Sequence, residues 1–64
     1  MVELEKIEAF TLGKQDEINQ KRRRSRAFYI RKFGEDGEEI YQSYILGYEN
    51  SREFRDSLDK PKKT

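Results

Sequence analysis

The chain has 64 residues with no cysteine and no histidine, and 42% of its residues are charged against 33% that are hydrophobic. This composition excludes a disulfide framework, a zinc site with cysteine or histidine ligands, and any catalytic dyad or triad built on histidine. A chain of this length forms one small domain over residues 1–64 and buries only about 60% of its unfolded surface. We therefore predict that the protein is not an enzyme and uses no cofactor and no metal ion.

The charge is sorted into blocks along the chain, although the net charge is only +1. The segment 21–32 contains seven Lys or Arg and no acid, whereas acids outnumber bases both before it and in residues 33–50. A basic block of this kind attracts a polyanion over a Debye length of about 10 Å. No apolar run is long enough to span a membrane or to serve as a signal peptide, so we predict an intracellular protein of the cytoplasm or nucleoid.

Residues 2–12 fit neither secondary-structure period cleanly. On a helix, Leu4, Ile7 and Phe10 share a face, whereas on a strand Leu4 and Phe10 lie on one side together with the terminal residues of the segment. We predict a strand, with a helix as the alternative, because a two-stranded hairpin alone is marginal in water and needs a third partner. Gly13 then ends the element, and residues 13–24 form a flexible basic arm.

Two β-prone, aromatic segments, residues 27–33 and 40–48, flank the dipeptide Asp36-Gly37. Such a dipeptide between alternating runs is typical of a type I′ hairpin turn. Asn50 with Glu53 then resembles a capping box, and Phe54 and Leu58 form the apolar stripe of a helix that ends before Pro61. Residues 61–64 are predicted to be a disordered tail. The predicted fold class is α+β, a small β-β-β-α domain whose three-stranded antiparallel sheet packs on the C-terminal helix.

The two faces of the predicted sheet differ in chemistry. One face carries Phe28, Ile30 and Ile45, which suit the helix stripe, and the other carries Tyr29, Arg31, Gln42 and Tyr44. Arg can bind guanine and Gln adenine in a major groove that admits a β-ribbon, so the second face is a candidate for DNA recognition. The alternative is that Tyr29 and Tyr44 are simply a stabilising cross-strand pair. The basic run could likewise be a solvated arm or a nuclear-import signal.

Residues 26–60 resemble the N-terminal arm-binding domain of tyrosine recombinases, the phage-type integrases. The resemblance rests on Arg26–Arg31, the Asp36-Gly37 turn, Gln42–Tyr48 and Asn50–Phe54. It departs from the family pattern at Glu38-Glu39, where a lysine usually follows the turn. The resemblance implies a three-stranded sheet inserted into the DNA major groove, with Tyr29, Arg31 and Gln42 against the DNA and the basic run on phosphates. Recombinase chemistry is not implied, because no catalytic domain follows.

We therefore predict a small DNA-binding protein or module, such as a regulator from a phage or mobile element, acting as a monomer or weak homodimer. Duplex DNA is the predicted partner. A host protein bound by a small phage-type regulator is one alternative, and single-stranded RNA is another. The predicted nucleic-acid-binding residues are Lys21, Arg22, Arg23, Arg24, Arg26, Tyr29, Arg31, Gln42 and Tyr44.

Overall fold

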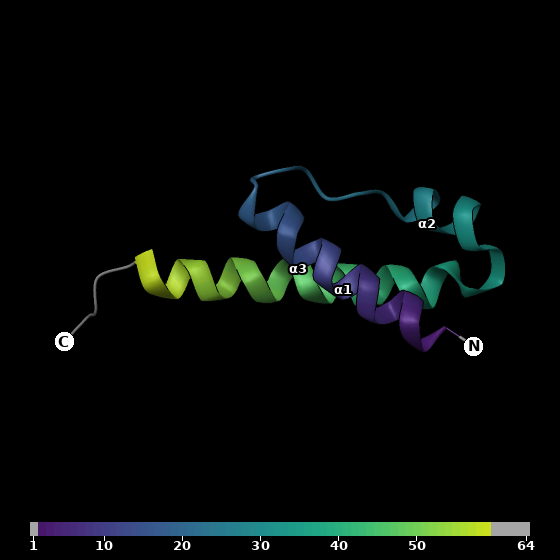
Figure 1. The fold of residues 1–64 in the computed structure, drawn as a ribbon. Coiled ribbons are helices and arrows are strands. Elements are labelled where there is room, and N and C mark those ends of the chain that lie inside the picture. Colours follow the sequence, from purple (N-terminus) through teal and green to yellow (C-terminus); the bar gives the residue numbers. More distant parts are fainter. Residues whose placement is uncertain (1, 60–64) are drawn as a thin grey trace.

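Residues 2–59 are described in the computed structural model, and their regular elements are all helical. Helix α1 spans Glu3–Ile18, α2 spans Arg26–Phe33, a 3₁₀ turn (η1) spans Gly34–Asp36, and α3 spans Gly37–Asp59. Helix α3 is the longest element, and α1 and α2 both lie along it (Figure 1). The molecule is elongated, with principal extents of 47 × 20 × 15 Å.

The predicted three-stranded sheet is wrong, because residues 2–59 contain no strand. Residues 2–12 lie almost entirely in α1, and the two predicted hairpin strands lie in α2 and α3. The Asp36-Gly37 dipeptide joins the 3₁₀ turn to α3 instead of forming a hairpin turn. Asn50, the predicted helix cap, lies inside α3, and the predicted tail 61–64 lies outside the described residues. The resemblance to the sheet-based integrase domain is therefore not supported.

A helical stripe along α3 explains why the aromatic segment 40–48 is a helix. Ile40, Tyr44, Gly47 and Ser51 follow one another at spacings of four, three and four residues, and all four are buried. This spacing places them on one face of a helix, whereas strand alternation would divide them between two faces of a sheet. Because Ile40 and Tyr44 are the largest fully buried side chains, packing along this stripe outweighs the β-propensity of the segment.

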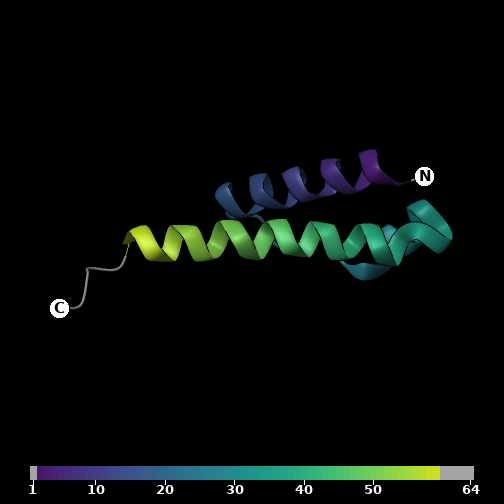
Figure 2. The same cartoon turned by 90° about the horizontal axis from the view of Figure 1, so that it is seen from below.

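Helices α1 and α3 run side by side in the same direction (Figure 2). Their contact uses small residues four apart, Ala9 and Gly13 on α1 and Gly47 and Ser51 on α3. A Cβ atom added at Gly13 would lie less than 3.0 Å from the carbonyl oxygen of Tyr44, and one at Gly47 less than 3.0 Å from that of Phe10. The two backbones are therefore in direct contact, which only glycine permits at these positions.

The end of α1 is set by its backbone hydrogen bonds and not by Gly13, which lies inside the helix. Lys21 N donates to Asp16 O at 2.8 Å, and Gln20 N donates to Glu17 O at 3.0 Å. Gln20 has a φ of 61°. This pair of bonds with a left-handed residue is a Schellman motif, here with glutamine at the position that glycine usually occupies. Residues 19–25 then connect α1 to α2, which lies beside the first turns of α3 (Figure 1).

Helix α2 is short and packs on the first turns of α3. Ser25 caps it, since its Oγ accepts a hydrogen bond from Phe28 N at 3.1 Å. Tyr29 is buried against α3, and its ring stacks on Phe33 with centroids 6.0 Å apart. The core consists of Ala9, Tyr29, Ile40 and Tyr44, with the partly buried Val2, Leu12, Phe33, Tyr41, Ile45 and Tyr48 packed around it.

Candidate nucleic-acid interface

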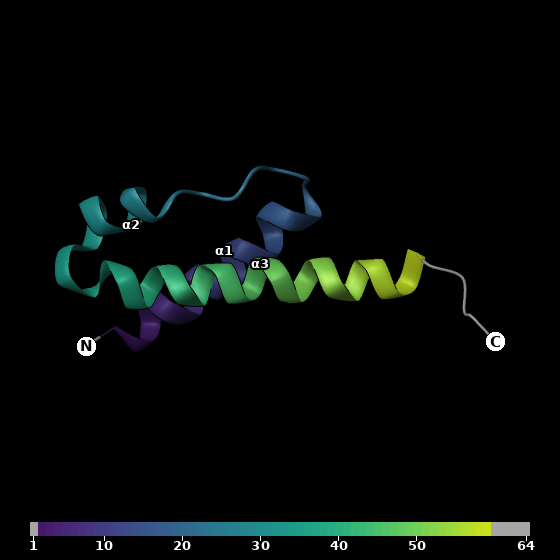
Figure 3. The same cartoon turned by 180° about the vertical axis from the view of Figure 1, so that it is seen from behind.

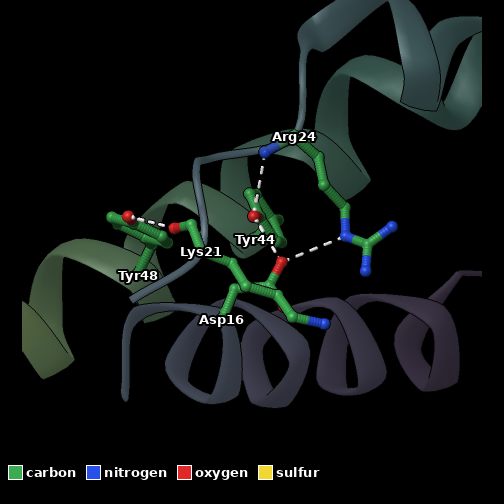
Figure 4. Close-up of polar contacts among 5 residues, drawn as sticks. All are labelled: Asp16, Lys21, Arg24, Tyr44 and Tyr48. Carbon is green, nitrogen blue, oxygen red and sulfur yellow. Dashed lines mark hydrogen bonds and ion pairs between the residues drawn. The ribbon is translucent and has the colours of Figure 1, made fainter. Parts of the chain in front are cut away.

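The basic segment Lys21–Lys32, here called the basic lobe, comprises most of the segment between α1 and α2 and most of α2. It therefore lies along one side of the molecule, as seen in the upper part of Figure 1. Hydrogen bonds with α1 and α3 fix its first part (Figure 4). Tyr44 Oη donates to Asp16 Oδ2 at 2.8 Å and accepts from Arg24 N at 2.9 Å. Tyr48 Oη donates to Lys21 O at 2.6 Å.

Three of the basic side chains are paired with acids from the other helices. Arg24 Nε lies 3.1 Å from Asp16 Oδ2, and Arg23 Nη1 lies 3.0 Å from Glu49 Oε2. Arg26 pairs with Glu38. These pairs hold the lobe on α1 and α3, so this part of the basic run has a structural role that the sequence pattern does not reveal.

Glu38 also binds Gln42, which donates to it from one helical turn further along α3 at 2.9 Å. This hydrogen bond, together with the one from Arg26, lowers the pKa of Glu38. Gln42 is exposed on α3, and it lies near the basic lobe through the shared contact with Glu38.

Four basic residues of the lobe have no ion pair with any residue between positions 2 and 59: Lys21, Arg22, Arg31 and Lys32. All four are exposed. Two cations of the lobe lie near the exposed ring of Phe28, with Arg24 Cζ at 5.5 Å and Lys32 Nζ at 5.8 Å from its centroid. The lobe thus presents positive charge beside one accessible aromatic ring.

Two predicted contact residues are not on the surface. Tyr29 is 3% exposed and Tyr44 is fully buried, so neither side chain reaches a ligand in this structure. The Tyr29 hydroxyl is buried with no hydrogen-bond partner among residues 2–59, whereas that of Tyr44 has two. Of the predicted site residues, the six basic ones lie on the basic lobe, whereas the side chains of both tyrosines lie in the core.

The sequence prediction omitted two exposed residues of the lobe that can contact a nucleic acid, the aromatic Phe28 and the basic Lys32. Their spacing of four residues is the signal that could have identified them, because it places both side chains on one face of a helix. A groove of about 130 Å³ separates this face from α1, and Glu5 and Glu8 line its other side. The groove has mixed charge, so it does not extend the positive surface.

Burial of Tyr44 has a consequence at alkaline pH. Burial raises the pKa of Tyr44 to about 12, and the hydrogen bond to Asp16 raises it as well. A tyrosine whose pKa is higher in the folded than in the unfolded chain contributes stability that is complete below pH 10 and is lost as the pH rises through about 12. We expect urea denaturation midpoints to fall steeply in this window. The midpoint of Tyr44→Phe should fall less steeply over the same pH range. An equal decline in the variant would show that ionisation of Tyr44 is not the cause.

No family model matches the chain, and no curated protein or solved structure was found to match it. None of the helices within residues 2–59 is long and apolar enough to cross a membrane. Across the same residues, no group of acidic side chains is arranged to hold a metal ion.

Proposed function

We propose that the protein binds nucleic acid, with duplex DNA as the first candidate, through the phosphate backbone and the basic lobe. The observation that carries the proposal is the group of four exposed cations, Lys21, Arg22, Arg31 and Lys32, none of which pairs with an acid in the described chain. Cations without an acidic partner can exchange their counterions for phosphates at little cost. The proposal implies an intracellular protein.

The geometry supports contacts with the backbone more than reading of the bases. Helix α2 has eight residues and carries Arg31 and Lys32 in its last turn, while Lys21 and Arg22 lie in the connecting segment. The positive charges are thus spread along the lobe, which suits a row of phosphates. Because Arg23, Arg24 and Arg26 are engaged with acids of α1 and α3, we assign them to holding the lobe in place.

The test is fluorescence anisotropy of a labelled mixed-sequence duplex over a range of salt concentrations. The double variant Arg22→Ala/Arg31→Ala should bind more weakly, and its log–log salt slope should fall by about two, because each lost phosphate contact removes ~0.9. Lys14→Ala/Arg52→Ala is the matched control, since it removes the same charge from exposed positions outside the lobe. Equal losses in both double variants would show a net-charge effect and contradict a site on the lobe.

The same experiment with labelled single-stranded RNA distinguishes RNA from duplex DNA as the ligand. Phe28 could stack on an unpaired base, and such stacking is worth about 1–3 kcal/mol per base. RNA that binds more tightly than the duplex and loses affinity in Phe28→Ala would replace DNA as the ligand. If the wild type and the variants bound the duplex with the same weak affinity at low salt, neither ligand would be supported.

A protein partner is the second candidate function. It is favoured by the large apolar side chains that residues 2–59 expose, namely Leu4, Ile7, Ile18, Phe28, Leu46, Phe54 and Leu58. Three of them, Leu4, Ile7 and Ile18, lie on α1, and exposed apolar side chains that gather on one face mark interaction sites. Salt distinguishes the two functions, because phosphate contacts weaken with rising salt and an apolar interface does not.

A further inference from the structure

Helix α1 has an exposed apolar face opposite its core. Leu4, Ile7, Thr11, Lys14 and Ile18, here called the outer stripe, recur at alternating spacings of three and four residues. Leu4 is 66% exposed, Ile7 62% and Ile18 61%. Ala9, Gly13 and Asp16, which face the interior, lie on the other side of the same helix. This spacing is that of the a and d positions in a coiled coil, which normally face a second helix.

The C-terminal end of the outer stripe adjoins a groove. Lys14 and Ile18 of α1 line it together with Asn50, Ser51 and Phe54 of α3, and its volume is about 320 Å³. The groove exists because α3 continues beyond the last turn of α1 (Figure 3). Phe54 is 65% exposed in this overhanging part. One apolar side chain from another molecule would therefore meet apolar surface on two helices here.

Charge along the outer stripe changes sign between its ends. The exposed acids Glu3 and Glu8 flank Leu4 and Ile7, whereas Lys14 lies near Ile18 with its Nζ 5.7 Å from the centroid of the Phe10 ring. A second helix with the same sequence would place acid against base if it ran in the opposite direction, and like against like if it ran in the same direction. The stripe is thus complementary to an antiparallel copy of itself.

We propose that a second copy of this chain packs its α1 antiparallel to α1, around a two-fold axis near Thr11. In this register Leu4 of each copy lies beside Ile18 of the other and enters the groove next to Phe54. Lys14 of each copy approaches Glu8 of the other. The contact is isologous, so every favourable pair occurs twice. The core-facing side of α1, toward the basic lobe, is not involved, and the proposal therefore does not depend on nucleic-acid binding.

The area of this interface predicts a weak dimer. A 16-residue helix is about 24 Å long. The surface buried by one helix pair and two groove contacts is therefore near or below about 1,200 Å², the low end for stable interfaces. We therefore expect a reversible equilibrium in which the fraction of dimer rises with protein concentration, and not a permanent dimer.

Sedimentation equilibrium over a wide range of protein concentration tests the proposal. Wild-type protein should move from the monomer mass toward twice that mass. Leu4→Glu should weaken dimerisation at least about tenfold, because it removes a buried leucine from both ends of the interface. Leu46→Glu is the matched control: Leu46 is 61% exposed on α3 and lies outside the outer stripe, so its variant should dimerise like the wild type. Circular dichroism should show the same helix content in all three proteins.

Charge reversal distinguishes the antiparallel register from nonspecific association of the exposed apolar side chains. Lys14→Glu should weaken the dimer, and adding Glu8→Lys in the same chain should restore it, because the two exchanged charges again face each other. A monomer at every concentration, equal effects of Leu4→Glu and Leu46→Glu, or failure of the double variant to recover would each overturn the proposal.

A disulfide test adds a geometric readout, since the chain contains no cysteine of its own. Thr11→Cys places one thiol on each side of the proposed two-fold axis and should oxidise to a covalent dimer. Ser57→Cys, exposed near the C-terminal end of α3 and far from the proposed two-fold axis, should do so much more slowly. Equal rates for the two variants would contradict the register.

Discussion

Gly47→Ala is expected to remove a large part of the protein's free energy of unfolding. Alanine raises helix propensity by about 1 kcal/mol relative to glycine, so the substitution would stabilise an exposed position. At Gly47, however, the new Cβ would lie less than 3.0 Å from the carbonyl oxygen of Phe10, a backbone atom that moves only if α1 separates from α3. Overpacking of this kind costs typically 1–3 kcal/mol and can cost more. We expect a net loss of about 2 kcal/mol or more, out of the ~3–5 kcal/mol that such a small core supplies.

Urea denaturation followed by circular dichroism measures this loss. Gly13→Ala should behave like Gly47→Ala, because its Cβ would meet the carbonyl oxygen of Tyr44 in the same contact. Ser57→Ala, exposed on α3, is the control and should be as stable as the wild type or slightly more stable. Wild-type stability in both glycine variants would mean that α1 and α3 do not touch through their backbones.

Asp16→Ala is expected to be the most destabilising change to a polar residue. Asp16 is 3% exposed, and its Oδ2 accepts hydrogen bonds from Tyr44 Oη and Arg24 Nε. Alanine would leave a buried hydroxyl and a partly buried guanidinium without their acceptor. Breaking a buried ion pair from one side costs about 3–5 kcal/mol. Arg24 is partly exposed, which reduces the loss, and we expect about 2–3 kcal/mol.

Two variants show whether this loss comes from the buried contacts. Glu8→Ala removes an exposed acid from the same helix, so its urea midpoint should stay close to the wild type. Tyr44→Phe removes only the hydroxyl and should lie between Glu8→Ala and Asp16→Ala. The hypothesis fails if Asp16→Ala is no less stable than Glu8→Ala.

The predicted fold was wrong because two local signals in the sequence favoured strands. Residues 40–48 are rich in tyrosine and isoleucine, which favours strands, and Asp36-Gly37 resembles a hairpin turn. The competing signal was the spacing of Ile40, Tyr44 and Ser51, which is helical and extends past Asn50. Local propensity was overridden because this spacing allows one continuous helix to bury the whole stripe against α1.

The glycines were the second source of error. Gly13 was predicted to end an element, and Gly47 lies in the segment 40–48, which was predicted to be a strand. Both lie inside helices, where they allow two backbones to approach. The actual end of α1 uses Gln20 in a left-handed conformation, which no propensity rule would select.

The pairing of the basic residues could not be predicted either. Arg23, Arg24 and Arg26 contact acids that lie between 8 and 26 positions away in the sequence, and those contacts exist only once the helices are assembled. The burial of Tyr29 and Tyr44 follows from the same assembly. What the sequence could indicate was the charge of the lobe, because seven cations without an intervening acid stay positive in any fold.

The parallel direction of α1 and α3 has a consequence for the speed of folding. Two antiparallel helices joined by a short loop can meet early, but here Lys6 meets Glu39 and Glu17 meets Ser51, pairs separated by 33 and 34 positions. The chain must close a loop of roughly 30 residues before the first of these contacts forms, and that entropy is lost before any packing compensates for it. We expect this protein to fold more slowly than helical hairpins of its size, because these long-range contacts between α1 and α3 raise its contact order.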